Sequence, residues 1–420
     1  MKTRLFIFLT VVALAEIYSF IAVRSALRSM PNFWKYGLMG LYIAVTLATW
    51  LGFTLFRAHN WESVPLAVRN IFIAFTMGLW VGKILVGAIM AIDDIRRLVM
   101  WVAGLIFTTV STKEAAEAGG GIGGGITRSV FLKQVALILG GTALGGFIYG
   151  LSNRYNYQVR RTQLAFANLP AAFKGLKIVQ ISDIHSGSFD DHRAVAKGIE
   201  RIMKEKPDII FFTGDLVNYK TDEVQPYKEI FAQLSAPLGV YSTLGNHDYG
   251  DYLQWPSKEA KKQNLDWLKE THAQMGWKLM MNEHVVLERG EDKIAVVGIE
   301  NWGAKAGFPK YGDMHKAYEG LKDKNVPFKM LLSHDPSHWD HQVVKEFQDI
   351  DITFSGHTHG MQFGIEIPGF KWSPVKYVYK NWAGLYEKNK QYLYVNRGFG
   401  FLGYPGRLGI LPEITVIELV

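Results

Sequence analysis

The sequence predicts an α+β protein in two parts, a multi-span α-helical membrane region followed by a domain that layers helices on β-sheet. The first observation is a set of long apolar runs, which are confined to the first third of the 420 residues. The second is the sequence pattern after residue 160, where short runs rich in Val, Ile and Phe alternate with polar segments. The third is the composition: 49% apolar and 20% charged residues exclude a disordered chain.

Five apolar runs predict membrane-spanning helices, which need about 17–25 mostly apolar residues. They cover residues 5–23, 36–56, 68–92, 98–110 and 130–151. The fourth run is short, so four spans is the alternative. The expected domains are a transmembrane region over 1–110 with about four spans, a glycine-rich linker over 111–129, a further span or signal-anchor helix over 130–151, and a layered domain over 160–420.

The charged residues inside and between these runs lead to two further predictions. Glu16 and Lys83 lie within apolar runs, where a charge is costly and often functional. They either pair with each other or belong to a transport pathway, and we expect the pairing. The cluster Asp93, Asp94, Arg96 and Arg97 falls between the third and fourth runs, where it predicts a solvated loop.

The basic excess of the chain belongs to its membrane part. Residues 1–150 contain 13 Lys and Arg against 6 Asp and Glu, whereas residues 151–420 contain 33 against 32. Such charges flank membrane spans, so no nucleic acid is expected as a partner. The absence of Cys excludes disulfides, thiolate metal ligands and cysteine nucleophiles.

The charge distribution does not decide the orientation in the membrane. Residues 127–133, directly before the last apolar run, are similar to a twin-arginine export signal with Ser129 in place of the second arginine. We therefore expect an integral membrane protein whose C-terminal domain lies on the extracytoplasmic side.

The C-terminal domain carries its polar residues at the ends of predicted strands. Strands are predicted at residues 177–182, 209–213, 240–244, 294–299, 330–333, 352–355 and 394–396, and helices at 193–205 and 257–275. Five of these strands are followed directly by Asp183 and His185, by Asp215, by Asn246, His247 and Asp248, by His334 and Asp335, and by His357 and His359. Strand ends of open α/β sheets are where ligand sites form, so these loops could meet at one edge.

These residue types predict a site for two divalent metal ions. Carboxylate, imidazole and amide oxygen suit Mn, Fe or Zn, with Mg also possible. If the backbone is extended, His357 and His359 point to one face and reach adjacent metals. A glycine before Asp215, Asn246 and His357 allows close backbone approach.

The motifs resemble those of the calcineurin-like metallophosphoesterase superfamily. All five blocks are present in order over residues 176–360: Asp183-x-His185, Gly214-Asp215, Gly245-Asn246-His247-Asp248, His334, and Gly356-His357-x-His359. Residues 355–362, 396–400 and 412–414 are also similar to bacterial membrane-associated YkuE/YaeI-type phosphodiesterases. The resemblance covers residues 160–420 and implies a four-layer αββα sandwich in a protein of the bacterial cell membrane.

The resemblance also implies roles for the matching residues. One metal would take Asp183, His185, Asp215 and His359, and the other Asp215, Asn246, His334 and His357. Asp215 would bridge the two ions, and a water between them would become a hydroxide nucleophile. We assign His247 as general acid or hydrogen-bond donor to the leaving oxygen, with Asp248 orienting it.

Two further residues are candidates for substrate contact. Asn218 follows the Asp215 motif closely, and Arg397 lies in a glycine-rich segment where a guanidinium could grip phosphate. The predicted function is hydrolysis of a phosphodiester or phosphoanhydride, with a lipid-linked or envelope substrate at the bilayer. The alternatives are a phosphomonoesterase, a membrane sensor that only binds ligand, and a transport protein. The oligomeric state is not predicted.

Overall fold

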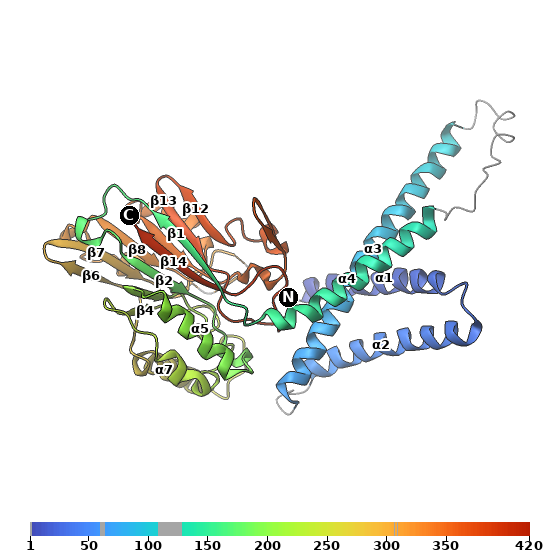
Figure 1. Ribbon diagram of the computed structural model, residues 1–420, viewed down its shortest axis with the longest axis horizontal. Coiled ribbons are helices and arrows are strands. Elements are labelled where there is room, and N and C mark those ends of the chain that lie inside the picture. The colour runs from blue at the N-terminus through green and yellow to red at the C-terminus, as the bar shows by residue number, and fades with distance from the viewer. Residues whose placement is uncertain (1, 59–63, 108–127, 306, 309) are drawn as a thin grey trace. The chain divides into compact units, whose positions relative to one another are not determined.

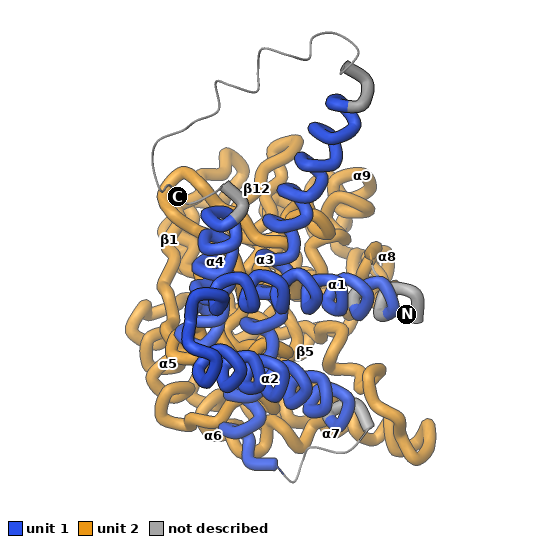
Figure 2. Tube along the Cα trace, turned by 90° about the vertical axis from the view of Figure 1, so that its right-hand side faces the viewer, with its two compact units in different colours: residues 1–149 blue, residues 150–420 orange. Residues whose placement is uncertain are grey.

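The computed structural model describes residues 2–58, 64–107, 128–305, 307–308 and 310–420. Most of the predicted glycine-rich linker, residues 111–127, lies outside these ranges. The chain forms two compact units, residues 1–149 and residues 150–420 (Figure 2). Each is described below by itself.

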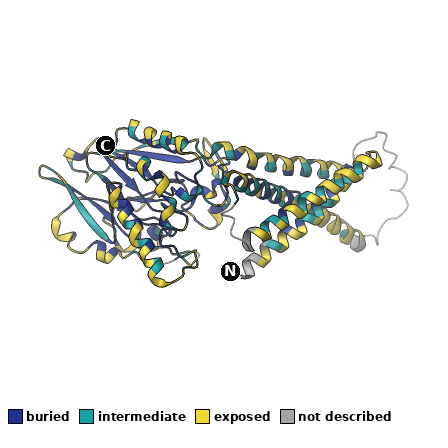
Figure 3. Ribbon diagram, turned by 90° about the horizontal axis from the view of Figure 1, so that it is seen from below, coloured by how far each residue is buried: buried dark blue, intermediate teal, exposed yellow. Residues whose placement is uncertain are grey.

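The described residues of the first unit form four helices, each long and apolar enough to cross a membrane. They are α1 (Lys2–Ala26), α2 (Asn32–Ala58), α3 (Leu66–Phe107) and α4 (Arg128–Gly150), which continues to the first residue of the second unit. Much of the length of these helices is exposed (Figure 3). Many of the exposed residues are large and apolar, as expected of helices that face lipid.

The number of helices differs from the expected five because α3 runs without a break for 42 residues. The loop predicted around residues 93–97 is helical. The Asp93 carboxylate accepts from Arg96 Nη2 and Arg97 Nε, each at 2.9 Å, one helical turn further on. These pairs neutralise the carboxylate within the helix, and no proline or glycine lies nearby to end it.

The second unit is built on two six-stranded sheets (Figure 1). One sheet has the order β1 (Gln158–Leu164), β14 (Glu413–Leu419), β2 (Lys177–Ile181), β3 (Ile209–Phe212), β4 (Val240–Ser242) and β5 (Trp277–Leu279). The other has the order β12 (Gly384–Lys388), β13 (Gln391–Val395), β9 (Ile352–Ser355), β8 (Phe328–Leu332), β7 (Asp292–Gly298) and β6 (Glu283–Arg289). A separate hairpin pairs β10 (Ile365–Ile367) with β11 (Phe370–Trp372).

Alternation along the strands divides the core into layers. In β2, Ile178 packs between the two sheets, whereas Val179 and Ile181 face the opposite side with residues of α5 (His192–Lys204) and α7 (Lys258–Gln274). The short helix α6 (Lys228–Phe231) adds to this outer layer. On the far side, β7 and β8 pack against α8 (Met314–Ala317) and α9 (Val344–Glu346). The result is the predicted four-layer αββα sandwich, and the fold class is α+β.

The parallel strands bring their carboxyl ends together. β2, β3 and β4 are parallel neighbours, as are β8 and β9. The hydrogen bonding continues beyond the strands, because Asp183 N donates to Gly214 O at 2.9 Å and Gly356 N to His334 O at 2.9 Å. The loops that carry the predicted site residues are therefore held in register with one another.

Candidate metal centre

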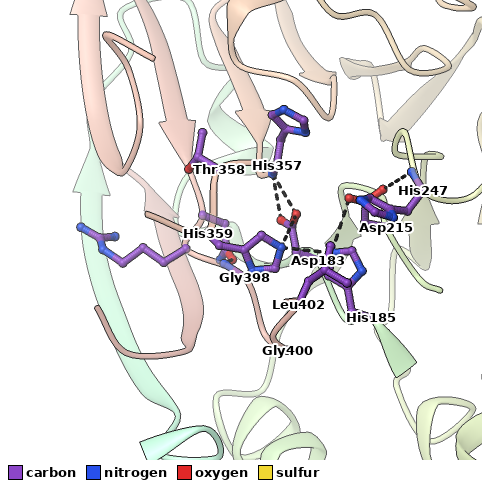
Figure 4. A network of polar contacts seen from close by, with 12 residues as sticks. Asp183, His185, Asp215, His247, His357, Thr358, His359, Gly398, Gly400 and Leu402 are labelled. Carbon is purple, nitrogen blue, oxygen red and sulfur yellow. Dashed lines mark hydrogen bonds and ion pairs between the residues drawn. The ribbon is translucent and has the colours of Figure 1, made fainter. Parts of the chain in front are cut away.

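The first group of donors comes from the loops after β2 and β9. Asp183, His185 and His359 are buried, and their ligand atoms lie within 4.8 Å of one another (Figure 4). His185 Nε2 lies 3.0 Å from His359 Nε2, and His359 Nε2 lies 3.3 Å from Asp183 Oδ1. Two imidazole nitrogens and a carboxylate oxygen thus converge on one small space.

The second group comes from the loops after β3, β4, β8 and β9. Asp215, His334 and His357 likewise place their ligand atoms within 4.8 Å of one another. Asn246 Oδ1 joins them, 2.8 Å from His357 Nδ1 and 3.2 Å from His334 Nε2. The amide nitrogen of Asn246 donates to Tyr252 Oη at 2.8 Å, which turns the oxygen toward the histidines.

Asp215 lies between the two groups. Its Oδ2 is 3.5 Å from His185 Nε2, which belongs to the first group, and 3.2 Å from His334 Nε2, which belongs to the second. Its other oxygen, Oδ1, accepts from the His247 backbone N–H at 2.8 Å. Asp215 therefore lies between the two candidate metal sites.

The backbone at these ligands is not extended, contrary to the geometry supposed for the Asp-x-His and His-x-His motifs. The φ angles of Asp183, His185, Asp215, His357 and His359 lie between 50° and 72°, in the left-handed region. Such conformations are uncommon for residues with side chains and gather at functional sites. The neighbouring glycines behave as predicted: a Cβ on Gly356 would meet Asp183 Oδ2, and one on Gly214 would meet Gly245 N.

The protonation states favour binding of cations. Burial lowers the pKa of His185 to about 3 and that of His357 to about 4, so both rings are neutral near pH 7. Burial also tends to lower the pKa of His334, but Asp215 and Asp183 outweigh it and raise that pKa to about 10. His334 therefore carries a proton that a bound cation would displace. Imidazole nitrogens, carboxylates and an amide oxygen fit divalent ions of the Mn, Fe, Zn or Mg type.

Outer contacts fix the orientation of the imidazoles. His334 Nδ1 lies 2.7 Å from Thr213 O, so Nδ1 carries the proton and Nε2 faces the donors. His357 Nε2 lies 2.8 Å from Tyr379 Oη, which in turn donates to Asp335 at 3.2 Å, and this leaves Nδ1 of His357 for the site.

His247 lies beside both donor groups. Its ring centroid is 5.0 Å from that of His185, and its Nδ1 lies 2.8 Å from the carbonyl oxygen of Asn218. Because a carbonyl only accepts, Nδ1 bears the proton. Nε2 is then the atom that can exchange a proton with a bound group.

Asp248 does not serve His247 in the way the sequence suggested. Its two oxygens accept four backbone N–H groups, those of Asp215, Leu216, Val217 and Gly245, at 2.8 to 3.2 Å. Asp248 therefore joins the loops after β3 and β4. The Asn218 carbonyl, and not the Asp248 carboxylate, contacts the His247 ring.

The two predicted substrate residues lie in different surroundings. Asn218 is next to the site, and its Nδ2 donates to Ser188 Oγ at 3.0 Å. Arg397 is only 3% exposed, and its guanidinium donates to Glu366 at 2.6 Å and to Glu413 at 2.5 Å. With both ends engaged by carboxylates, Arg397 holds structure together here, and its contact with phosphate stays a prediction.

Several contributors were not identified as site residues from the sequence. Tyr379 and Asp335 orient His357, Tyr252 orients Asn246, and Glu223 accepts from the backbone of Asn218 at 2.6 Å. In the sequence, Asp335 is notable only because it follows His334 directly. The contacts of Tyr379 join segments 22 and 44 residues apart, so the sequence holds no local signal for them, whereas Tyr252 and Glu223 lie six and five residues from their partners.

Comparison with known proteins agrees with this geometry. Residues 176–361 match the family described as calcineurin-like phosphoesterase. Residues 3–154 match the family described as probable calcineurin-like phosphoesterase, transmembrane domain. The second match shows that the helical unit also has counterparts in this family.

Three curated relatives illustrate the similarity. The uncharacterized metallophosphoesterase YkuE of Bacillus subtilis is 30% identical over 307 residues, which are 70% of this chain and 98% of YkuE. The phosphodiesterase YaeI of Escherichia coli is 26% identical over 300 residues, 70% of this chain and 100% of YaeI. A transmembrane protein with metallophosphoesterase domain from Danio rerio is 30% identical over 280 residues, 65% of this chain, and the match spans only 60% of that protein.

The chain therefore belongs to the calcineurin-like metallophosphoesterase family, whose members are metal-dependent phosphoester hydrolases, and it is a membrane protein.

Proposed function

We propose that the chain hydrolyses a phosphodiester or phosphoanhydride at a membrane surface, with two divalent metal ions as cofactors. The observation that carries this proposal is the position of Asp215 between two groups of imidazoles and carboxylates, with His247 beside them. The name of the relative YaeI, a phosphodiesterase, supports a diester as substrate.

The residues divide the work as follows. Asp183, His185, Asp215 and His359 would hold one ion, and Asp215, Asn246, His334 and His357 the other. Ions there would supply Lewis acidity toward phosphoryl oxygens and lower the pKa of a nucleophilic water.

His247 acts on the leaving group. The Asn218 carbonyl holds the proton on Nδ1, so Nε2 is the atom that can pass a proton to the departing oxygen. Asp248 keeps the loops after β3 and β4 in position and thereby fixes both Asp215 and His247.

The membrane unit suggests where the substrate lies. A phosphoesterase tethered by helices of spanning length meets lipid-linked or envelope phosphates at high local concentration. We place the catalytic unit on the extracytoplasmic side of a bacterial cell membrane. A reporter that is active only outside the cytoplasm, fused after Asn153, tests this side and must be silent if the unit is cytoplasmic.

The test of hydrolysis uses the full chain in lipid nanodiscs. Chromogenic bis- and mono-(p-nitrophenyl) phosphate are supplied with Mn²⁺, and with chelator as a control. We expect turnover that requires Mn²⁺, that is faster for the diester, and that is abolished in Asp215→Asn.

The other outcomes separate the alternatives. A preference for the monoester would replace the diesterase by a phosphomonoesterase. Bound metal without turnover of either compound or of a phospholipid would favour a sensor. A folded protein that binds no metal would refute the proposal.

A further inference from the structure

The hairpin β10–β11 presents an apolar face to its surroundings. Ile365 pairs with Trp372 and Ile367 with Phe370, so these four side chains share one face of the two-stranded ribbon. Ile365, Ile367 and Phe370 are 50%, 59% and 52% exposed. We call these four residues the hairpin face.

The opposite side of the same hairpin is fixed to the body of the domain. Glu366 accepts from Arg397 at 2.6 Å and from Arg160 at 2.8 Å, and Arg397 is almost fully buried. Lys371, the cross-strand partner of Glu366, donates to the Ala383 carbonyl at 2.5 Å. The buried ion pair sets which side of the ribbon faces outward, so the exposure of the hairpin face is a fixed feature of the fold.

Aromatic and basic residues extend the hairpin face. Trp372 Nε1 donates to Tyr377 Oη at 3.4 Å, and Tyr377 and Val378 are 74% and 52% exposed. Lys376 and Lys380 are exposed beside them. Glu366, which is paired, is the single acidic residue between 361 and 380. Apolar and aromatic side chains accompanied by lysine, with no free acid, are the composition of a surface that meets phosphate headgroups.

The hairpin is linked by hydrogen bonds to the first residue of its own unit, Gly150. Gly364 N donates to Leu408 O at 2.9 Å, and the adjacent Arg407 N donates to Gly150 O at 2.9 Å. Gly150 is the last residue of α4, whose apolar stretch has spanning length. A single segment, residues 404–409, thus contacts both Gly150 and the base of the hairpin.

The hairpin also lies between two residues of the metal centre in the chain. It follows His359 and precedes Tyr379, which contacts His357 at 2.8 Å. Ser373 at its far end donates to the carbonyl of Gly360, next to His359, at 2.8 Å.

From these observations we propose that the hairpin face and Tyr377 insert into the surface of the bilayer and hold the metal centre at the level of lipid phosphates. The occupant of this surface is the lipid bilayer, because exposed lysines accompany its apolar side chains and the chain carries helices of spanning length. The substrate class is then the phosphate ester of a lipid headgroup, a statement that rests on the proposed hydrolase function. The docking of the hairpin face on the bilayer does not depend on that function.

Site-directed spin labelling tests the docking without any catalytic readout. The chain contains no Cys, so a cysteine at Ile367 or Phe370 is labelled uniquely. A cysteine at Glu229, whose side chain is 88% exposed on α6, is the control. In vesicles of phosphatidylcholine and phosphatidylglycerol, we expect labels at 367 and 370 to be several-fold more accessible to oxygen than to a water-soluble nickel chelate, and the reverse at 229.

Other results would overturn the docking. Labels at 367 and 370 with the accessibility of the control would place the hairpin face in water. Labels shielded from both reagents would show a protein occupant, and spin–spin broadening would identify that occupant as a second copy.

A substrate comparison tests the lipid headgroup. Ile367→Glu should lower hydrolysis of a vesicle-borne phospholipid several-fold and leave hydrolysis of the soluble diester unchanged. Trp267→Glu replaces an apolar side chain of similar exposure, 50%, on α7, and should change neither. Equal losses on both substrates, or none on the phospholipid, would refute the lipid assignment. A wild-type chain that hydrolyses nothing would instead refute the proposed function, while the spin labels still decide the docking.

Discussion

The Nδ1 atom of His247 lies 2.8 Å from the carbonyl oxygen of Asn218. This contact leaves Nε2 as the only ring nitrogen that can act on a substrate. The carbonyl is itself held, because Glu223 accepts from the backbone N–H of Asn218 and Asn218 Nδ2 donates to Ser188. The imidazole is thus positioned by a backbone carbonyl, which no side-chain substitution removes directly.

Replacement of His247 should separate catalysis from metal binding. In His247→Ala we expect turnover of the diester to fall by roughly 10²–10⁴-fold, the usual contribution of general acid catalysis. The metal content should remain that of the wild type, since His247 belongs to neither donor group. Metal analysis and steady-state kinetics on the same preparation measure both. His315→Ala, at a side chain that is 75% exposed, serves as the control. Loss of metal in His247→Ala would make it a ligand instead.

Replacement of Asp215 should affect both metal positions. Its Oδ2 faces His185 in one group and His334 in the other, so Asp215→Asn removes the charge that both ions would share. Asp183→Asn alters one group only. We expect elemental analysis after desalting to find both metals depleted in Asp215→Asn and one in Asp183→Asn. Full retention in Asp215→Asn would exclude the bridge.

Asp248 should matter for stability in addition to activity. An asparagine has a single acceptor oxygen, so Asp248→Asn turns an NH₂ group toward two of the four backbone N–H donors. Each unsatisfied buried group costs about 1–3 kcal/mol. We expect a lowered thermal midpoint at pH 8. An unchanged midpoint with lost activity would instead support the orienting role first predicted for Asp248.

His272 should make the domain sensitive to acid. It is fully buried against Ser242, with Nδ1 3.0 Å from the hydroxyl, and burial lowers its pKa to about 3. The unfolded chain takes up this proton near pH 6.5 and the folded chain does not. Above pH 6.5 His272 is neutral in both states and the domain keeps its full stability. Between pH 6.5 and about 3, the free energy of unfolding falls by up to about 1.4 kcal/mol per pH unit.

The measurement compares thermal midpoints of wild type and His272→Gln at pH 7.5 and pH 5. The wild type should lose more on acidification than the variant does. Equal losses would show that other groups account for the acid sensitivity.

The sequence was sufficient to locate the metal donors because each lies directly after a buried strand. Short runs rich in Val, Ile and Phe identified β2, β3, β4, β8 and β9, and parallel pairing then brings their ends to one edge. The spacing of motifs such as His357-x-His359 is local and can be read along the chain. The edge strand β1 was missed, because its polar sequence, Gln158–Leu164, lacks the apolar run of the interior strands.

Contacts between distant segments could not be predicted in this way. The partner of His247 is a backbone carbonyl 29 residues away, which any residue type supplies. Asp248 was assigned to the ring next to it in sequence, but four loop N–H groups compete for its oxygens. In α3, the charged cluster was interpreted as a loop because hydropathy does not register that Asp93 is neutralised one helical turn away by Arg96 and Arg97.

The pair Glu16 and Lys83 should contribute to the stability of the helical unit. Lys83 Nζ donates to both Glu16 oxygens at 2.8 and 2.7 Å and to Thr46 Oγ1 at 2.7 Å, so one ammonium joins α1, α2 and α3. Removing one partner leaves a buried charge uncompensated, at a cost of roughly 3–5 kcal/mol, whereas apolar replacement of both can be neutral. Lys83→Met should therefore lower the thermal midpoint, and Glu16→Leu combined with Lys83→Met should restore it.

Two assays, hydrolysis by the nanodisc-bound chain and flux across sealed vesicles, separate a structural role of this pair from a transport role. If the pair only fixes helix packing, the double variant should turn over the soluble diester at the wild-type rate, because neither residue belongs to the metal centre. A transport pathway would require the charges themselves, and the stable double variant would then lose flux across sealed vesicles that the wild type supports. Flux in the wild type that disappears in the double variant, despite a restored midpoint, would show that Glu16 and Lys83 act in transport.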